Sequence, residues 1–125
     1  MSKSILVVDD TRSMRKMVAT VLQAAGYSVE EAGDGAEALE KAKTRVFDLV
    51  VTDHNMPRMD GVTLVRALRG LAEYDAVALI VLSTETGAEL KAKGRDAGAT
   101  GWMVKPFDPE KLLEMLRRAF AQTTA

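Results

Sequence analysis

Short runs of apolar and β-branched residues alternate five times with longer segments in which apolar residues recur every three or four positions. A short apolar run between polar residues predicts a strand buried on both faces, and the longer spacing predicts a helix with one buried face. The predicted strands are residues 5–8, 28–32, 49–53, 76–83 and 101–104. The second strand has a single branched apolar residue, Val29, so we expect it at an edge of the sheet.

Caps and glycines predict where the helices begin and end. Gly26 ends the first helix, because glycine adopts the left-handed conformation without strain. The apolar face of that helix comprises Met14, Met17, Val18, Val21, Leu22 and Ala25. The thinner face of the second comprises Ala36, Leu39, Ala42 and Val46. Thr86 and Glu89 form a capping-box pattern that predicts the start of the fourth helix, and Asp108 followed by Pro109 predicts the start of the fifth.

Alternating strands and helices predict a parallel sheet with helices on both faces, since crossovers between parallel strands are right-handed. The first, third and fourth strands are the most apolar and should be central, and the second and fifth should be edges. This arrangement suits an α/β flavodoxin-like doubly wound (βα)5 fold with a five-stranded parallel sheet in the order 2-1-3-4-5.

Composition and charge narrow the functions that the chain can have. Its 125 residues suit one domain over residues 1–125, and a net charge of -1 gives no reason to expect a nucleic-acid or membrane surface. It has no cysteine, which excludes disulfides and thiolate metal sites. No signal-peptide pattern follows Met1, and no apolar run approaches the roughly 20 residues that span a bilayer. We therefore expect a soluble, monomeric, cytoplasmic protein.

Acidic residues follow the two strands that should lie side by side at the centre of the sheet. Asp9 and Asp10 come after the first strand, and Asp53 ends the third. In the predicted strand order the ligand site is the crevice between these strands, where the three carboxylates meet. Like charges at short range disfavour ionisation, and a hard cation such as Mg²⁺ would hold the carboxylates ionised. The alternative is that these aspartates only begin turns.

A hydroxyl and an amine follow the other two strands of this half of the sheet. Ser83 ends the fourth strand and Lys105 follows the fifth. Together with a divalent cation they would surround Asp53 with groups that bind phosphoryl oxygens. An aspartate carboxylate is a nucleophile toward phosphoryl groups, so Asp53 is the candidate acceptor. His54 is the only histidine, and a metal-ligand role is disfavoured because it has no second histidine or cysteine beside it.

The chain resembles the receiver domain of two-component response regulators over nearly its whole length, and most closely the single-domain chemotaxis regulators of the CheY type. Each matching motif is weak evidence alone, but the four together are specific for this family. The matching pieces are Val7-Val8-Asp9-Asp10, Thr52-Asp53-His54-Asn55-Met56-Pro57 with Met59-Asp60-Gly61, Leu82-Ser83-Thr84, and Val104-Lys105-Pro106-Phe107.

The resemblance implies a role for each matching residue. Asp53 would be phosphorylated by a histidine kinase, and Mg²⁺ would be held by Asp9, Asp10, Asp53 and the backbone carbonyl of Asn55. Ser83 and Lys105 would bind the phosphoryl oxygens, and the Lys105-Pro106 bond would be cis. Trp102 occupies the position of the family's aromatic switch residue, commonly Tyr or Phe. From its pattern alone, ordinary packing of this tryptophan is equally acceptable.

Three classes of function are compatible with these residues. The favoured one is a signalling switch that catalyses only its own phosphotransfer and dephosphorylation. The second is a phosphatase or phosphotransferase with an aspartyl nucleophile, which usually has Asp-x-Asp on its first strand, whereas this chain has Asp9-Asp10. The third is an interaction module without phosphorylation. The output of a switch would pass through a protein contact, and the alternatives are a flagellar motor switch component, another partner, or a role as a phosphate sink in a relay. A phosphatase is a further possible partner.

Overall fold

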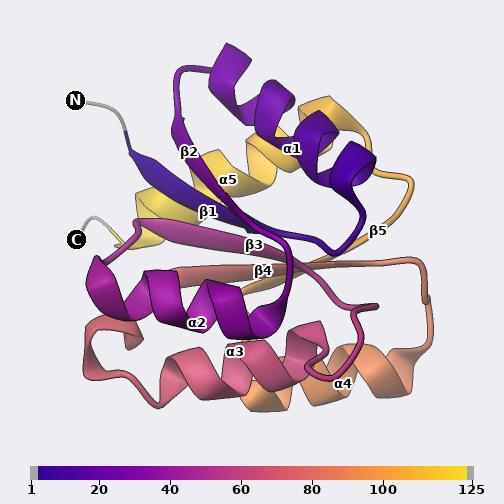
Figure 1. Cartoon of the computed structure of the whole chain (residues 1–125). Coiled ribbons are helices and arrows are strands. Elements are labelled where there is room, and N and C mark those ends of the chain that lie inside the picture. Colours follow the sequence, from indigo (N-terminus) through magenta and orange to yellow (C-terminus); the bar gives the residue numbers. More distant parts are fainter. Residues whose placement is uncertain (1–2, 124–125) are drawn as a thin grey trace.

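The computed structural model describes residues 3–123, in which five strands and five α-helices alternate along the chain (Figure 1). The strands are β1 (Ser4–Val8), β2 (Ser28–Ala32), β3 (Leu49–Asp53), β4 (Ala78–Ser83) and β5 (Gly101–Val104). The helices are α1 (Arg12–Ala24), α2 (Gly35–Thr44), α3 (Gly61–Arg69), α4 (Ala88–Ala97) and α5 (Pro109–Thr123), with a short 3-10 helix, η1 (Ala72–Tyr74), after α3.

The sheet has the predicted strand order. Its five parallel strands follow one another as β2-β1-β3-β4-β5, which confirms the flavodoxin-like doubly wound fold. β1 pairs with β3, with Val8 opposite Thr52, so Asp9 and Asp53 stand at neighbouring strand ends. β3 pairs with β4, with Asp53 opposite Leu82, the residue before Ser83.

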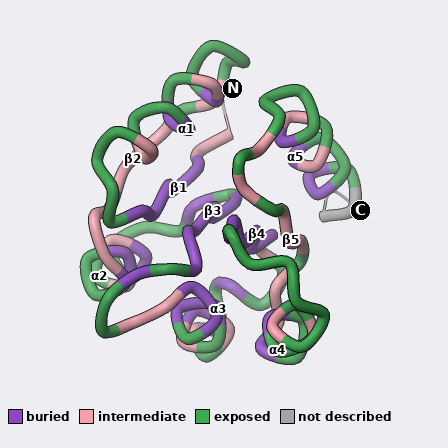
Figure 2. The backbone as a smooth tube through the Cα atoms, turned by 90° about the vertical axis from the view of Figure 1, so that its right-hand side faces the viewer, coloured by how far each residue is buried: buried purple, intermediate pink, exposed green. Residues whose placement is uncertain are grey.

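Helices cover both faces of the sheet, α1 and α5 on one and α2, α3 and α4 on the other (Figures 1 and 2). Because alternate strand residues point to opposite faces, each face has its own apolar core. The α1–α5 face contains Ile5, Val7, Leu49, Val51, Val18, Leu22, Leu112 and Leu116. The opposite face contains Leu6, Val8, Val50, Leu79, Val81, Leu64, Val65 and Leu68. No helix within residues 3–123 is long and apolar enough to cross a membrane.

Apolar periodicity overstated the buried face of two helices. Met17 is 52% exposed, and the buried residues of α1 are Val18, Ala19 and Leu22. Val46 is 50% exposed because α2 ends at Thr44, before the residue could join its buried face. The assignment of these two residues to buried helix faces was wrong.

The start of α4 also differs from the prediction. Gly87 is the N-cap residue, and no side chain caps the helix. Thr86 therefore stands one residue before the cap and cannot form the predicted capping box with Glu89, so that prediction was wrong. At the other end, Arg69 of α3 donates from Nε to the carbonyl of Gly98, with a donor–acceptor distance of 2.9 Å. A side-chain hydrogen bond thus holds the C-terminus of the helix, whereas no side chain caps its N-terminus.

Backbone amides of α4 should exchange with solvent faster than those of α1. The buried residues of α4 are Gly94 and Ala97, its leucine is half-buried, and a mid-helix glycine costs about 1 kcal/mol relative to alanine. Few buried apolar contacts imply a low free energy of local opening. Hydrogen exchange followed by mass spectrometry measures the two helices in one sample. Equal or greater protection of α4 would contradict this account.

Candidate functional site

The ends of β1 and β3 bring three carboxylates together. Asp9 directly follows β1 and is 3% exposed, Asp53 is the last residue of β3 and is 4% exposed, and Asp10 is exposed. One carboxylate oxygen from each lies within 4.8 Å of those of the other two. Strand alternation places Asp9 after Ile5 and Val7, on the α1–α5 face of the sheet. The structure therefore groups all three predicted acids in one pocket.

Lys105 supplies the positive charge of this pocket. Its Nζ lies 2.6 Å from Oδ1 of Asp53, and its side chain is only 11% exposed. That oxygen has no hydrogen-bond partner of acceptable geometry among the described residues, so the contact is one of charge, with the ammonium approaching off the hydrogen-bonding direction. The backbone N–H of Lys105 donates to the carbonyl of Ser83 at 2.7 Å, and the Lys105-Pro106 peptide bond is cis.

Burial and charge both act on Asp9. Burial raises the pKa of its carboxyl above the ordinary value, and the charges of Asp53 and Asp10 add to this effect. The Thr11 N–H, which donates to Asp9 Oδ1 at 2.9 Å, and the ammonium of Lys105 oppose it. Three carboxylates thus face one ammonium, and the group of oxygen donors suits a hard divalent cation. The unsatisfied Oδ1 of Asp53 also fits a site that gains a positively charged ligand.

Ser83 is the last residue of β4 and lies at the same edge of the sheet as the three carboxylates. It is fully buried, and its Oγ accepts the N–H of Glu85 at 3.0 Å, which leaves the hydroxyl hydrogen available for another acceptor. Asn55 is exposed on the loop after β3, and its side-chain oxygen accepts the hydroxyl of Thr84 at 3.4 Å. The loops after β3 and β4 are therefore joined beside the acidic pocket.

His54 packs against the fold and is not part of the acid group. It is 8% exposed, and its Nδ1 accepts the N–H of Val62 at 3.4 Å. Its ring centre lies 5.9 Å from that of Trp102. Trp102 packs with the core on the α2–α4 face, whereas its neighbour Met103 packs on the face of α1 and α5. The indole therefore stands across the sheet from the acidic pocket, as the odd spacing to Lys105 predicts.

Gly94, in the middle of α4, lies against the indole ring of Trp102. A Cβ added to Gly94 would lie 2.6 Å from an indole carbon of Trp102, so the helix makes room for the ring at this position. A glycine in the middle of a helix is unfavourable, and this was the signal that the sequence offered for a close contact at that position. Replacing Gly94 would force the ring or the helix to move.

The comparisons with known proteins agree with this geometry. The family described as "Response regulator receiver domain" matches residues 5–117. Response regulator MprA of Mycobacterium tuberculosis is 41% identical over 123 residues, which is 98% of this chain and 53% of that protein. The chain thus spans about half the length of the curated relatives it matches.

Two solved structures extend the comparison. The chemotaxis protein CheY4 of Vibrio cholerae is 48% identical with a TM-score of 0.91, covering 95% of this chain and 99% of that one. A response regulator protein from Burkholderia multivorans is 45% identical with a TM-score of 0.78, covering 94% of both chains. The fold and the pocket define a phosphorylation-regulated α/β signalling domain. The chain belongs to the response regulator receiver domain family, so the domain that it forms is a signalling switch.

Replacing Asp9 with asparagine should stabilise the protein when no divalent cation is present. Because the folded-state pKa of Asp9 is raised, the ionised carboxylate costs stability at pH values above both its unfolded and folded pKa, and this cost vanishes below the unfolded value of 3.8. Asparagine keeps an acceptor for the Thr11 N–H without the charge. We expect Asp9→Asn to raise the Tm by a few degrees at neutral pH in chelator, and to lose this advantage in acid.

The predicted rise in Tm is checked by thermal unfolding of wild type, Asp9→Asn and the exposed control Asp96→Asn. Adding Mg²⁺ should raise the Tm of wild type more than that of Asp9→Asn. A Tm for Asp9→Asn at or below that of wild type at neutral pH would contradict the electrostatic account.

Proposed function

We propose that this chain is a single receiver domain that accepts a phosphoryl group on Asp53 from a histidine kinase. The observation that carries the proposal is the 2.6 Å contact between Lys105 Nζ and Asp53 Oδ1 inside a group of three carboxylates. Such an arrangement holds a nucleophilic carboxylate next to a fixed positive charge, where the added negative charge of a phosphoryl group is stabilised.

The chemistry is an in-line transfer. An oxygen of Asp53 bonds to phosphorus as the bond from phosphorus to the donor nitrogen breaks, and the released imidazole nitrogen retains that electron pair. Lys105 and the hydroxyl of Ser83 bind oxygens of the transferred group. Mg²⁺, when bound by Asp9, Asp10, Asp53 and the carbonyl of Asn55, supplies positive charge that lets an anionic donor approach. The same residues support the later attack of water that removes the phosphoryl group.

The output that we propose is a protein contact in chemotaxis, with a flagellar motor switch component as the partner. The support is the Vibrio cholerae chemotaxis protein, which this chain covers over 99% of its length at 48% identity. A phosphate sink or relay receiver that does not act on the motor is the alternative. We further propose a monomeric, cytoplasmic protein whose signal a phosphatase can end. These details rest on resemblance.

Asp53→Asn should abolish phosphorylation by acetyl phosphate. The amide is not a nucleophile toward phosphorus, and the other aspartates of the pocket would be engaged in holding the cation. Intact-mass spectrometry after incubation with acetyl phosphate and Mg²⁺ should show one added phosphoryl group on wild type and none on the variant. Asp48→Asn is the matched control at the opposite end of β3, where an amide oxygen can still accept the N–H of Ser4. Labelling of Asp53→Asn at the wild-type rate, or of wild type in excess chelator, would sink the proposal.

Ser83→Ala should weaken the response of Trp102 to a phosphoryl mimic. When the Ser83 hydroxyl donates to a phosphoryl oxygen, the loop after β4 is drawn inward and the packing around the indole changes. Trp102 is the only tryptophan, so its fluorescence reports this step directly. We expect a spectral change when Mg²⁺ and beryllofluoride are added to wild type, and a much smaller one in Ser83→Ala. Thr20→Ala, which removes an exposed hydroxyl from α1, is the control. A full change in Ser83→Ala with beryllofluoride bound would show that coupling bypasses Ser83.

A further inference from the structure

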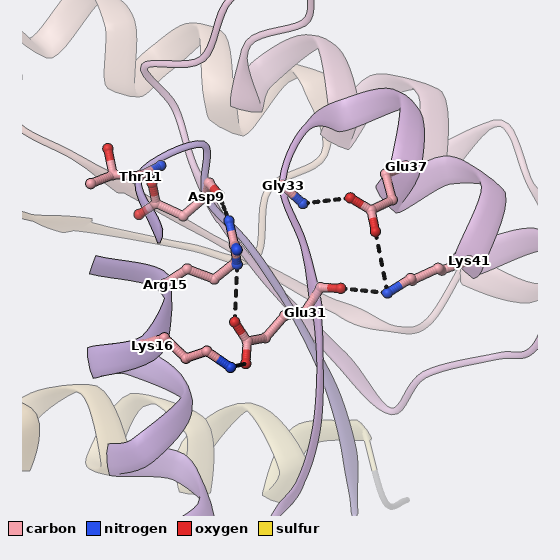
Figure 3. A network of polar contacts seen from close by, with 8 residues as sticks. All are labelled: Asp9, Thr11, Arg15, Lys16, Glu31, Gly33, Glu37 and Lys41. Carbon is pink, nitrogen blue, oxygen red and sulfur yellow. Dashed lines mark hydrogen bonds and ion pairs between the residues drawn. The ribbon is translucent and has the colours of Figure 1, made fainter. Parts of the chain in front are cut away.

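Arg15 joins the first helix to the end of the first strand. Its Nη1 donates to the backbone carbonyl of Asp9 at 2.8 Å, and its Nε donates to Oε1 of Glu31 at 3.0 Å (Figure 3). The side chain is 17% exposed, so these contacts form in a partly desolvated place where each is stronger than on an open surface. One guanidinium therefore fixes a residue of the acidic pocket against a residue of β2.

The contact with Asp9 gives a hydrogen-bond donor to its backbone carbonyl, which lies beyond the end of β1. Asp9 lies just past the last residue of β1, and its N–H still donates to the carbonyl of Ala32 at 3.1 Å. Its own carbonyl has left the strand ladder, and Arg15 provides the donor that a buried carbonyl requires. The carboxylate is fixed separately, by the N–H of Thr11. Asp9 is thus held at its N–H, its carbonyl and one carboxylate oxygen.

Glu31 is itself held in place, so it can orient Arg15. Lys16 Nζ lies 2.8 Å from its Oε2, and Lys41 donates to its backbone carbonyl (Figure 3). Hydrogen bonding from Lys16, followed by that from Arg15, lowers the pKa of Glu31 against the opposing effect of burial, so the carboxylate is ionised at neutral pH. Lys41 also pairs with Glu37 at 3.4 Å. The network connects α1, β2 and α2 behind the acidic pocket.

We propose that Arg15 is a positioning residue for the cation site, and that Glu31 holds its guanidinium in the productive orientation. Arg15 contacts the carbonyl of Asp9 and not its carboxylate, so it acts through the position of the backbone from which the metal-binding oxygen projects. Groups that orient metal ligands commonly change affinity when they are removed. This inference rests on the proposed function, because it assumes that Asp9 binds the divalent cation.

The test measures cation affinity without any phosphorylation. Mn²⁺ replaces Mg²⁺ because it also prefers oxygen ligands, and the free ion is quantified by electron paramagnetic resonance in the presence of the full chain. We expect Arg15→Gln to weaken Mn²⁺ binding by about tenfold. Arg45→Gln is the matched control, since it removes another arginine–glutamate ion pair of β2, with Glu30 at 2.7 Å, without touching Glu31 or Asp9. Its Mn²⁺ affinity should stay within about twofold of wild type.

Two further variants separate positioning from general stability. Glu31→Ala leaves Arg15 present but removes its orienting partner, and should weaken Mn²⁺ binding by several-fold. In a double-mutant cycle, Arg15→Gln and Glu31→Ala should be clearly less than additive, because they break one linked contact. Arg15→Lys, which keeps the charge but can reach only one of the two acceptors, should bind with intermediate affinity. If Arg15→Gln fails to fold, Glu31→Ala and Arg15→Lys carry the test.

The outcomes for this inference and for the proposed function are distinct. If wild type does not bind Mn²⁺, or binds it equally well after Asp10→Asn, the cation site itself is wrong and the proposed function fails. If wild type binds Mn²⁺ through these acids but Arg15→Gln matches it, the positioning role of Arg15 is overturned. It is also overturned if Arg45→Gln weakens binding as much as Arg15→Gln, or if the two effects in the cycle simply add.

Discussion

The balance of charge at the carboxyl end of the sheet is the constraint on which the rest of this structure depends. Two of the three clustered carboxylates, Asp9 and Asp53, are almost fully buried, and among residues 3–123 the ammonium of Lys105 is the positive charge that contacts them. Burying like charges is unfavourable unless they are paired or protonated. The raised pKa of Asp9 is the visible result. A pocket in this condition gains stability from any ligand that adds positive charge, and it becomes receptive to an anionic group once that charge is present.

The register of the parallel strands forms this pocket. β1 and β3 are adjacent parallel strands, so their terminal aspartates meet at one edge, and β4 and β5 bring Ser83 and Lys105 to the same edge. The cores on the two sheet faces hold these strands in fixed alignment. Trp102 belongs to the face opposite the pocket, where it packs into the space that Gly94 leaves in α4. We propose that a change at the pocket reaches the helix surface through β5, the short strand that contains Trp102 and ends one residue before Lys105.

Patterns local in the sequence predicted most of the fold and the acids of the site. Apolar runs and their lengths predicted the strand order, and acids at strand ends follow directly from it. The cap at Thr86 and the burial of Met17 were wrong because single-residue shifts of a helix start or rotation are decided by tertiary packing. The contacts of Arg15 with Asp9 and of Gly94 with Trp102 join different elements, so no short pattern encodes them. The sequence around Glu31 is that of an ordinary charged edge strand. Its role is visible only in the structure, where β2 lies beside α1 and Glu31 binds Arg15.

The most direct test of the central claim is a crystal structure of the full chain with Mg²⁺ and beryllofluoride. The account predicts beryllium bonded to a carboxylate oxygen of Asp53, Mg²⁺ in contact with Asp9 and Asp10, and the ammonium of Lys105 on a fluoride. The hydroxyl of Ser83 should donate to another fluoride. Beryllofluoride bonded to a different residue, or an ordered complex on Asp53 in which Lys105 and Ser83 contact no fluoride, would contradict the account.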